Sequence, residues 1–431
     1  MMIKNIYQEP AAADYPTLCS RPTLAADKLD ELMGQIFSAV ADRGDNAVRD
    51  YSRQFDKVEL ESFAVGTSTV QGASSQLSSD LKTAIQRAAD NIRTFHSAQM
   101  PADINVTTSA GIVCSQRAVP IDSVGIYIPG GTAPLLSTVL MLAIPAQVAA
   151  CRRVVLCTPP SSDGGIDPAI AYCADLCGVT EMYAVGGAHA IAAMSIGTET
   201  IAKVDKVFGP GNQYVAAAKV YASRYGTAMD IPAGPSELLV YADDTCVPAF
   251  VAADLLSQAE HGEDSQVVLV TSAADIVTAV NKQLARQIES LPRKTIAAKA
   301  LTNSRAIIIE EVEKAWQYIN TYAPEHLIIA SAEADQYVPY VRSAGSVFLG
   351  NYSPESVGDY ATGTNHTLPT DGWARSYSGV NMDAYLKKVT FQQLTASGLR
   401  DIGPTVVAMA EAETLQAHAN AVSIRLQTLN T

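Results

Sequence analysis

The sequence contains no run of basic residues. It has 30 lysines and arginines against 44 aspartates and glutamates, which gives a formal net charge of −14. A protein that binds nucleic acid needs a basic patch to neutralise the phosphates. We therefore expect no nucleic-acid partner, and any anionic cofactor must be bound by local features such as helix N-termini.

Targeting and membrane-spanning segments are also missing. The first ten residues, MMIKNIYQEP, contain neither the apolar core of a signal peptide nor an arginine-rich amphipathic stretch. The most apolar window, residues 133–150, is interrupted by polar residues and a proline, which favours a buried helix over a membrane span. The seven cysteines include no C-x-x-C pair, so we expect reduced, buried thiols in a cytoplasmic protein without membrane contact.

Several common catalytic motifs are absent as well. No G-x-G-x-x-G follows a predicted strand, so the standard dinucleotide-binding fingerprint is lacking. Neither a G-x-S-x-G elbow nor an H-E-x-x-H helix occurs. The turns Gly130-Gly131 and Gly209–Asn212 can still bring backbone amides close to a pyrophosphate, although such turns alone are weak evidence.

The sequence does contain a regular alternation of strand and helix patterns. Between residues 121 and 235, apolar strands alternate with helices, often through glycine-rich turns, which indicates a parallel, doubly wound sheet. Ligands of such sheets bind at the carboxyl ends of the strands. A second α/β region follows, and the chain ends in a tail with one predicted helix over about 405–427. The predicted strands are 112–119, 124–128, 154–157, 182–185, 204–208, 238–241, 266–271, 306–309, 327–329 and 347–349.

The chain has six histidines, the usual residues for metal binding and proton transfer near neutral pH. His96 lies on a helix with apolar spacing, and we interpret it as structural. In the segment 254–262, Gln258 and His261 share one face of a predicted helix that Gly262 ends, an arrangement that can bind a metal. Because glutamine is an unusual metal ligand, this segment by itself is more typical of a solvated helix end.

Three further segments combine carboxylates with histidine. Glu325 and His326 precede a predicted strand and form a natural acid–base pair, although adjacent Glu-His also occurs by chance. Asp359 and His366 lie in a polar, glycine-rich segment after the strand 347–349, where a site is expected or an ordinary surface loop is the alternative. Glu413 and His418 lie on the last helix, and a solvated face is the simpler interpretation there.

Taken together, eight segments resemble the histidinol dehydrogenase family over nearly the whole chain. Eight segments in the right order are far more specific than any single motif. They are VGIYIPGGTAPLLSTVLMLAIPAQVA (124–149), VFGPGNQYVAAAK (207–219), DIPAGPSELLV (230–240), DLLSQAEHG (254–262), APEHLII (323–329), GSVFLG (345–350), SVGDYATGTNHTLPT (356–370) and AEAETLQAH (410–418).

The resemblance implies a role for each candidate residue. The zinc ligands would be Gln258, His261, Asp359 and His418, with His418 donated by the partner subunit of a homodimer. Glu325 and His326 would be the catalytic pair. The substrate would contact Ser236, Gln258, His261, His326, Asp359, His366, Glu413 and His418, and NAD would contact Tyr127, His189 and Asn212. The family usually has glutamine where this chain has His189, which leaves that cofactor contact open.

The implied reaction is the oxidation of L-histidinol to L-histidine through histidinal, with two NAD and one Zn²⁺ per site, as the last step of histidine biosynthesis. A zinc hydrolase, a dehydrogenase for another small alcohol and a non-enzymatic binding module are the alternatives. We expect an α/β fold of two Rossmann-like parallel-sheet domains with helical N- and C-terminal extensions. The expected parts are an N-terminal arm (1–23), a larger α/β domain with the metal and catalytic residues (24–120 and 236–376), an NAD domain (121–235) and a tail for dimer contact (377–431).

Overall fold

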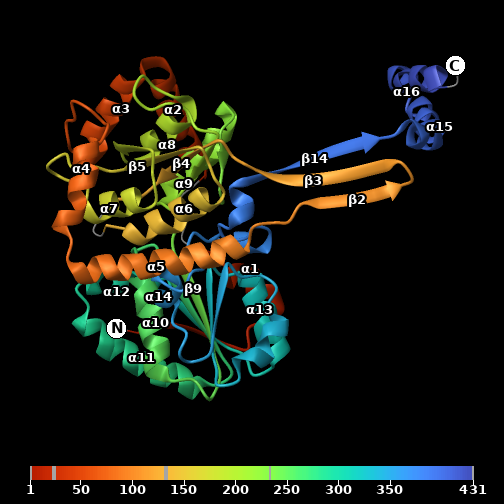
Figure 1. Ribbon diagram of the computed structural model, residues 1–431. Helices are drawn as coiled ribbons and strands as arrows, with labels where there is room; N and C mark the ends of the chain where they lie inside the picture. Colours follow the sequence, from red (N-terminus) through yellow and green to blue (C-terminus); the bar gives the residue numbers. More distant parts are fainter. Residues whose placement is uncertain (1, 22–25, 131–133, 233, 430–431) are drawn as a thin grey trace. The chain divides into compact units, whose positions relative to one another are not determined.

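The computed structural model describes residues 2–21, 26–130, 134–232 and 234–429. Gly131 of the predicted Gly130-Gly131 turn lies outside the described residues. The chain forms two compact units, one of Met1–Gln99 with Ile121–Tyr385 and one of Met100–Pro120 with Leu386–Thr431. The first unit contains two parallel sheets (Figure 1).

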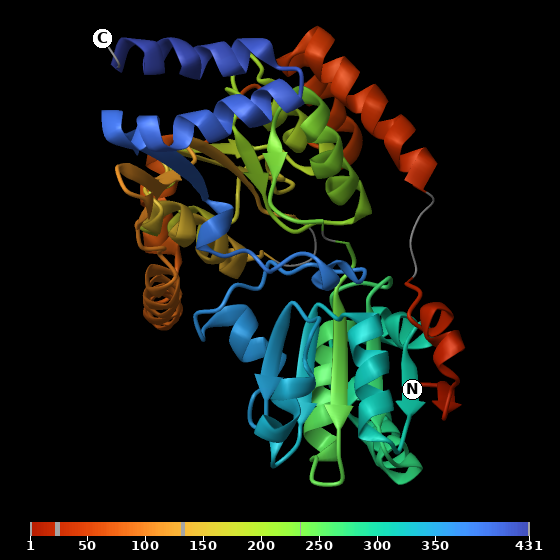
Figure 2. The ribbon, with the colours of Figure 1, turned by 90° about the vertical axis from the view of Figure 1, so that its right-hand side faces the viewer.

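The larger sheet of the first unit has six parallel strands in the order β1-β11-β10-β9-β12-β13. Its central strands are buried on both faces, which explains their unbroken apolar sequences. Helices cover both faces of this sheet (Figure 2). The strands are β1 (Asn5–Gln8), β9 (Glu237–Ala242), β10 (Gln266–Thr271), β11 (Arg305–Ile308), β12 (His326–Ala330) and β13 (Ser346–Leu349).

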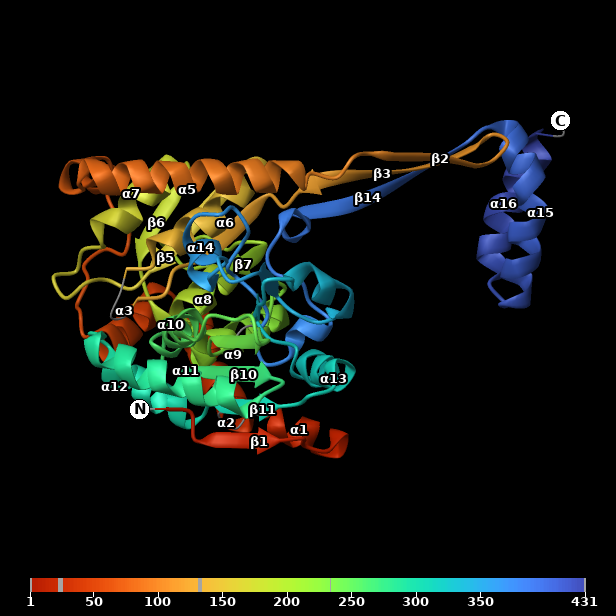
Figure 3. The same cartoon turned by 90° about the horizontal axis from the view of Figure 1, so that it is seen from below.

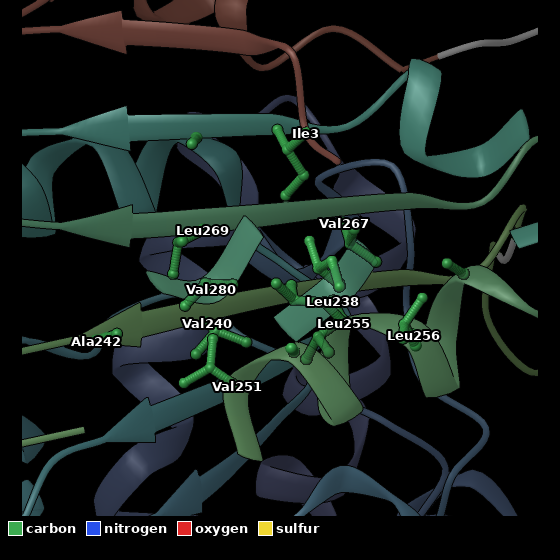
Figure 4. Packing of buried hydrophobic residues seen from close by; sticks show 14 of the residues in the cluster. Ile3, Leu238, Val240, Ala242, Val251, Leu255, Leu256, Val267, Leu269 and Val280 are labelled. Atoms are coloured by element: carbon green, nitrogen blue, oxygen red, sulfur yellow. The ribbon is translucent and has the colours of Figure 1, made fainter. Parts of the chain in front are cut away.

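Two hydrophobic clusters hold the helices to this sheet. On one face, α10 (Pro248–Ala259), α11 (Ala274–Gln287) and α12 (Lys294–Thr302) pack against β9 and β10. Figure 4 shows this cluster, in which Val251 and Leu255 of α10 lie against Leu238 and Val240 of β9. The other face is covered by α13 (Val312–Tyr322) and the short α1 (Tyr15–Leu18).

The smaller sheet of the first unit has five parallel strands in the order β6-β5-β4-β7-β8. Numbered along the chain, the five strands follow the order 3-2-1-4-5, and β9–β13 of the larger sheet repeat that order. This is the doubly wound topology, with a switch point beside the first strand of each sheet. The elements are β4 (Ser123–Tyr127), α6 (Leu136–Val148), β5 (Arg153–Thr158), α7 (Pro168–Leu176), β6 (Glu181–Ala184), α8 (Gly187–Ile196), β7 (Lys206–Phe208), α9 (Gln213–Ala222) and β8 (Ala228–Met229).

The N-terminal helices pack differently from our expectation. We placed residues 24–120 with the larger sheet, but α2 (Ala26–Arg43) and α3 (Asp45–Tyr51) pack against α8 and α9 of the five-stranded sheet. Met33, Ile36 and Phe37 of α2 supply the apolar face that packs in one cluster with residues of α8 and α9. The helix α5 (Ser79–Ala98) packs on α6, and its His96 is fully buried, with its Nδ1–H donating to the carbonyl of Ile92 at 2.8 Å. The predicted structural role of His96 is confirmed.

The second unit is an antiparallel sheet followed by a helix pair. Strands β14 (Leu386–Leu394), β3 (Ile112–Pro120) and β2 (Ile104–Ser109) pair in that order, and only β3 was predicted. Helices α15 (Ala396–Ala412) and α16 (Gln416–Leu429) pack side by side (Figure 3). The prediction of one continuous last helix is wrong, because Thr414 has a φ of 61° and the helix breaks there between α15 and α16.

The described helices include none with the length and apolarity needed to cross a membrane. The apolar window that the sequence analysis assigned to a buried helix forms α6, whose residues are nearly all buried. All seven cysteines are free thiols.

Candidate active site

A cavity in the first unit lies where two different sheet edges meet. From the five-stranded sheet, the loops after β4 and β7 contribute their residues at the carboxyl ends of the strands, which is the switch point. From the six-stranded sheet, the contributing residues lie at the amino ends of β9 and β12. The lining includes Pro129, Leu135, Thr138, Pro210, Gly211, Asn212, Ser236, Gln258, His261, Glu325, His326, Asp359, His366, Leu368 and Thr370.

The position of these residues at the amino ends of β9 and β12 corrects one expectation about the six-stranded sheet. The polar segment after β13 was expected to form a site as a loop at the carboxyl edge of the sheet. Instead, Asp359 lies in the short helix α14 (Glu355–Tyr360), and it reaches His326, the first residue of β12. The carboxyl-edge rule therefore holds here for the five-stranded sheet and not for the six-stranded one.

Glu325 and His326 are buried side by side at the start of β12. The Nδ1–H of His326 donates to the carbonyl of Glu237 at 3.2 Å, and its Nε2 lies 3.3 Å from an Asp359 oxygen. A Glu325 carboxylate oxygen lies 3.6 Å from Nδ1 of the same ring. Burial alone would lower the pKa of His326, but the adjacent Glu325 and Asp359 outweigh burial and raise it well above its ordinary value. The two carboxylates thus stabilise the protonated imidazole.

Gln258, His261 and Asp359 line the same cavity as Glu325 and His326. Gln258 is buried, and its Oε1 has no hydrogen-bond partner among the described residues. Burial would raise the pKa of Asp359, but the neighbouring histidines, above all His326, lower it, so the carboxyl stays ionised. The cavity lining thus includes an unpartnered oxygen, an ionised carboxylate and an imidazole, a donor set that fits a zinc ion.

Within the described part of one chain, no three His, Cys, Asp or Glu side chains form a metal cluster. The predicted set accounts for this, because Gln258 is an amide and His418 is expected from a second copy. His418 lies in α16 of the second unit, and Glu413 is the C-cap of α15. The break at Thr414 separates these two residues, so they do not share one helix as predicted.

The predicted substrate contacts Ser236 and His366 both line the cavity. His366 donates from Nδ1 to the carbonyl of Asp359 at 2.9 Å, and its Nε2 lies 3.1 Å from the hydroxyl of Thr138 in α6. Burial lowers the pKa of His366 and favours its neutral form. Thr138 could not be predicted as a site residue from the sequence, because it lies inside an apolar helix pattern that gives no sign of a polar contact.

The three predicted cofactor contacts divide into two groups. Asn212 lines the cavity, and its side-chain oxygen caps α9 by accepting from the amides of Tyr214 and Val215. Tyr127 and His189 are buried near the Gly186-Gly187 turn and are not among the described cavity-lining residues. The Tyr127 hydroxyl accepts from the amide of Gly187 at 3.0 Å.

His189 replaces the glutamine of the family pattern and has partners of its own. Its Nε2 lies 3.2 Å from the hydroxyl of Ser52 and 3.6 Å from a carboxylate oxygen of Asp56. Both partners come from the segment that follows α3. His189 therefore joins the N-terminal helices to the turn after β6.

A buried ion pair fixes the turn after β7. Lys219 donates to the carbonyl of Gly209 at 2.8 Å, Asp230 accepts from the amide of Gly209 at 2.9 Å, and the two side chains meet at 2.5 Å. Gly209 has a φ of 134°, and a Cβ there would lie 2.2 Å from the Tyr127 carbonyl oxygen. Only glycine fits this close approach of the two switch-point loops.

We expect Lys219→Met to destabilise the fold by about 3–5 kcal/mol, because it leaves the buried Asp230 carboxylate uncompensated. Denaturant unfolding of the single variant and of the double variant Lys219→Met/Asp230→Asn measures this cost. The double variant should recover much of the loss. A loss of about 1 kcal/mol or less, the value of a surface ion pair, would contradict a tightly coupled pair.

Comparison with known proteins agrees with the predicted family. A family model described as histidinol dehydrogenase matches residues 19–426. The histidinol dehydrogenase of Bacteroides thetaiotaomicron is 50% identical over 425 residues, covering 99% of each chain. That of Photobacterium profundum is 48% identical over 427 residues, covering 98% of this chain and 96% of its own.

A solved structure gives the same result at the level of the fold. The crystal structure of histidinol dehydrogenase from Elizabethkingia anophelis is 50% identical, covers 100% of both chains and has a TM-score of 0.96. This match confirms the predicted α/β fold. The chain belongs to the histidinol dehydrogenase family.

Proposed function

We propose that the protein is a cytoplasmic enzyme that oxidises L-histidinol to L-histidine through histidinal, with two NAD and one zinc ion per site. One observation carries the proposal. The Glu325–His326 pair shares a cavity with Gln258, His261 and Asp359, and this cavity opens at the switch point of a doubly wound sheet. The assay that tests it is NADH formation from histidinol by the purified protein. A zinc hydrolase with the same residues would turn over without NAD.

The switch point between β4 and β7 supports an NAD site. The loops after these strands approach closely at Gly209, and Asn212 begins α9 beside the cavity. Backbone amides at such a helix N-terminus favour the anionic pyrophosphate, which suits a chain with a net charge of −14. The contacts of Tyr127 and His189 with NAD stay predictions.

Gln258, His261 and Asp359 would hold zinc, together with His418 of a second copy. When bound, zinc supplies a Lewis acid and a template for the imidazole and amine groups of the substrate. His366 and Ser236, which line the same cavity, would bind the substrate. Because its pKa is lowered, His366 offers a neutral imidazole, and its Nε2 can hydrogen-bond a polar substrate group that replaces the Thr138 hydroxyl.

His326 would act as the base in both oxidations in its neutral form, although the adjacent carboxylates raise its pKa and favour the protonated form in the absence of substrate and metal. Its Nδ1–H is engaged by the carbonyl of Glu237, which leaves Nε2 as the nitrogen that accepts the hydroxyl proton. NAD, when bound at the switch point, would supply the acceptor for the hydride of the substrate carbon. The flanking carboxylates of Glu325 and Asp359 stabilise the imidazolium that results. In the second half, Glu325 would activate the water that adds to histidinal.

We further propose a homodimer with shared sites. The antiparallel sheet of the second unit leaves large apolar side chains exposed, and a three-stranded ribbon needs a covered face to be stable. A second copy of the chain would cover it and bring His418 and Glu413 to the cavity. The exposed residues of this sheet are Ile104, Val106, Val113, Val119, Val389, Phe391 and Leu394.

Mixing two inactive variants, His418→Ala and His326→Ala, is expected to regenerate activity. Only a hybrid dimer contains a site with both residues intact, and random exchange in a two-fold dimer would restore about a quarter of the sites. Activity is measured after subunit exchange has been verified by mass. Each variant mixed with itself is the control. Verified exchange without any recovery would rule out a shared site.

A further inference from the structure

A buried ion pair lies directly behind the catalytic residues. The guanidinium of Arg21 donates from Nε and Nη2 to the two carboxylate oxygens of Glu237, at 3.1 and 2.9 Å. Arg21 also donates to the carbonyls of Cys19 and Tyr322, and its guanidinium lies 3.8 Å from the centre of the Tyr322 ring. The side chains of the pair are only 7% and 2% exposed, so solvent hardly competes with these contacts. The N-terminal arm is thus joined to the first residue of β9.

The backbone of Glu237 contacts three residues of the proposed site. Its amide donates to Oε2 of Glu325 at 2.8 Å. Its carbonyl accepts from Nδ1 of His326 at 3.2 Å and from Nε2 of Gln258 at 3.3 Å. One peptide segment therefore orients the proposed base, the proposed water-activating carboxylate and a proposed metal ligand.

The side chain of Glu237 is held from a second direction. The backbone amide of Asp371 donates to Oε1 of Glu237 at 2.6 Å. Asp371 belongs to the same segment as the cavity-lining residues Leu368 and Thr370. The carboxylate is thus fixed by a bidentate arginine and by one backbone donor. Two groups of donors on one carboxylate leave it little rotational freedom.

Stability alone does not account for a charged pair at this depth. Desolvation of two buried charges offsets much of their attraction, and apolar residues of similar volume often stabilise a core as well. Bidentate geometry contributes direction as well as energy. By fixing the backbone of Glu237, the ion pair can also fix the side chains that this backbone orients in the proposed active site.

We propose that Arg21 is a positioning residue of the active site, which acts through the carboxylate of Glu237 to hold Glu325, His326 and Gln258 in their working geometry. The assignment rests on the proposed function for the roles of these three residues. It adds a contribution from the N-terminal arm, whose Arg21 is not among the residues that line the cavity.

The test compares Arg21→Met with Arg305→Met. Arg305 of β11 donates to the carbonyl of Leu18 and to the hydroxyl of Ser20, so it holds the same arm through residues other than Glu237. Both substitutions remove a guanidinium from the arm. Only Arg21→Met releases the Glu237 carboxylate, which makes Arg305→Met the matched control for a loosened arm.

We expect Arg21→Met to lower kcat for histidinol by about 10²-fold, since displacing catalytic groups by about 1 Å has an effect of this size. The KM values should change little, because Arg21 does not line the cavity. Arg305→Met should keep kcat near that of the wild type, and Arg21→Lys should restore part of the loss by keeping one charged donor. Equal kcat losses in the two methionine variants, at matched folded fractions, would overturn the assignment.

A readout that is independent of turnover keeps this inference separate from the proposed function. The Glu237 amide donates to Glu325, and its hydrogen exchange should accelerate in Arg21→Met but not in Arg305→Met. If the wild type failed to oxidise histidinol, the proposed function would fall while exchange still decided the role of Arg21. Unchanged exchange at Glu237 would overturn that role. If Arg21→Met did not fold, Glu237→Gln, which keeps an acceptor for Asp371, would be measured in the same way, with the same accelerated exchange expected.

Discussion

Removal of metal is expected to abolish histidinol oxidation, and added zinc is expected to restore it. Gln258 presents an unpartnered buried oxygen, Asp359 stays ionised, and His261 lines the same cavity, so one chain supplies three of the four proposed ligands. Without the zinc ion, these side chains would have no cation to bind, and the substrate would lose the metal that orients it. The measurement is NADH formation before chelation, after exhaustive chelation and after zinc addition, with metal content determined by elemental analysis.

Two variants sharpen this experiment. His261→Ala should lower the zinc content and the activity together, because an imidazole ligand is lost. His96→Gln is the matched control, since His96 is a buried histidine whose partners are Ile92 and Asn365 and which does not line the cavity. It should keep its zinc. Full activity in a sample that elemental analysis finds free of metal would refute the zinc assignment.

The second large effect is expected for Glu325→Gln, which should slow the oxidation of histidinal more than that of histidinol. Only the second half-reaction needs an activated water, and glutamine cannot take a proton at neutral pH. Loss of a general base typically lowers a rate by about 10²–10⁴-fold. The amide oxygen of the variant can still accept from the Glu237 amide, so the local geometry is kept. Single-turnover NADH formation from each substrate measures the two halves.

His326→Asn should instead impair both halves, because the same base would deprotonate the alcohol and the hydrate. Glu355→Gln is the matched control for a buried carboxyl of α14. Burial raises the pKa of Glu355 well above its ordinary value and favours its neutral form, which glutamine mimics, and we expect nearly normal rates. If Glu325→Gln slowed both halves equally, Glu325 would be positioning His326 instead of activating water.

Most strands of the parallel sheets could be predicted because their environment leaves a strong pattern, whereas the mostly exposed edge strand β1 and the short edge strand β8 were not predicted. Strands buried on both faces need apolar residues throughout, and β9, β10 and β12 show this as short unbroken runs. The strands β2 and β14 are mostly exposed, so no core imposes a pattern on them. The break at Thr414 was missed because no glycine or proline marks it.

The candidate site was predictable mainly through family resemblance. Single motifs such as Glu325-His326 were weak, and only their order along the chain made them specific. The ion pair of Arg21 and Glu237 could not be predicted, because the two residues are 216 positions apart in the sequence and neither belongs to a recognisable motif. The sequence placed Glu325 and His326 before the strand β12, at its amino end. It did not predict that Gln258, His261 and Asp359 meet them there, because this depends on how α10 and α14 pack.

The measurement that tests the central claim most directly is the stoichiometry of the reaction. Limiting L-histidinol is oxidised to completion with excess NAD, and both NADH and the organic product are quantified. Oxidation of an alcohol to an acid at one site removes two hydrides, so the account predicts two NADH for each histidinol consumed and histidine as the product. One NADH with accumulation of histidinal, or conversion of histidinol without any NADH, would contradict it.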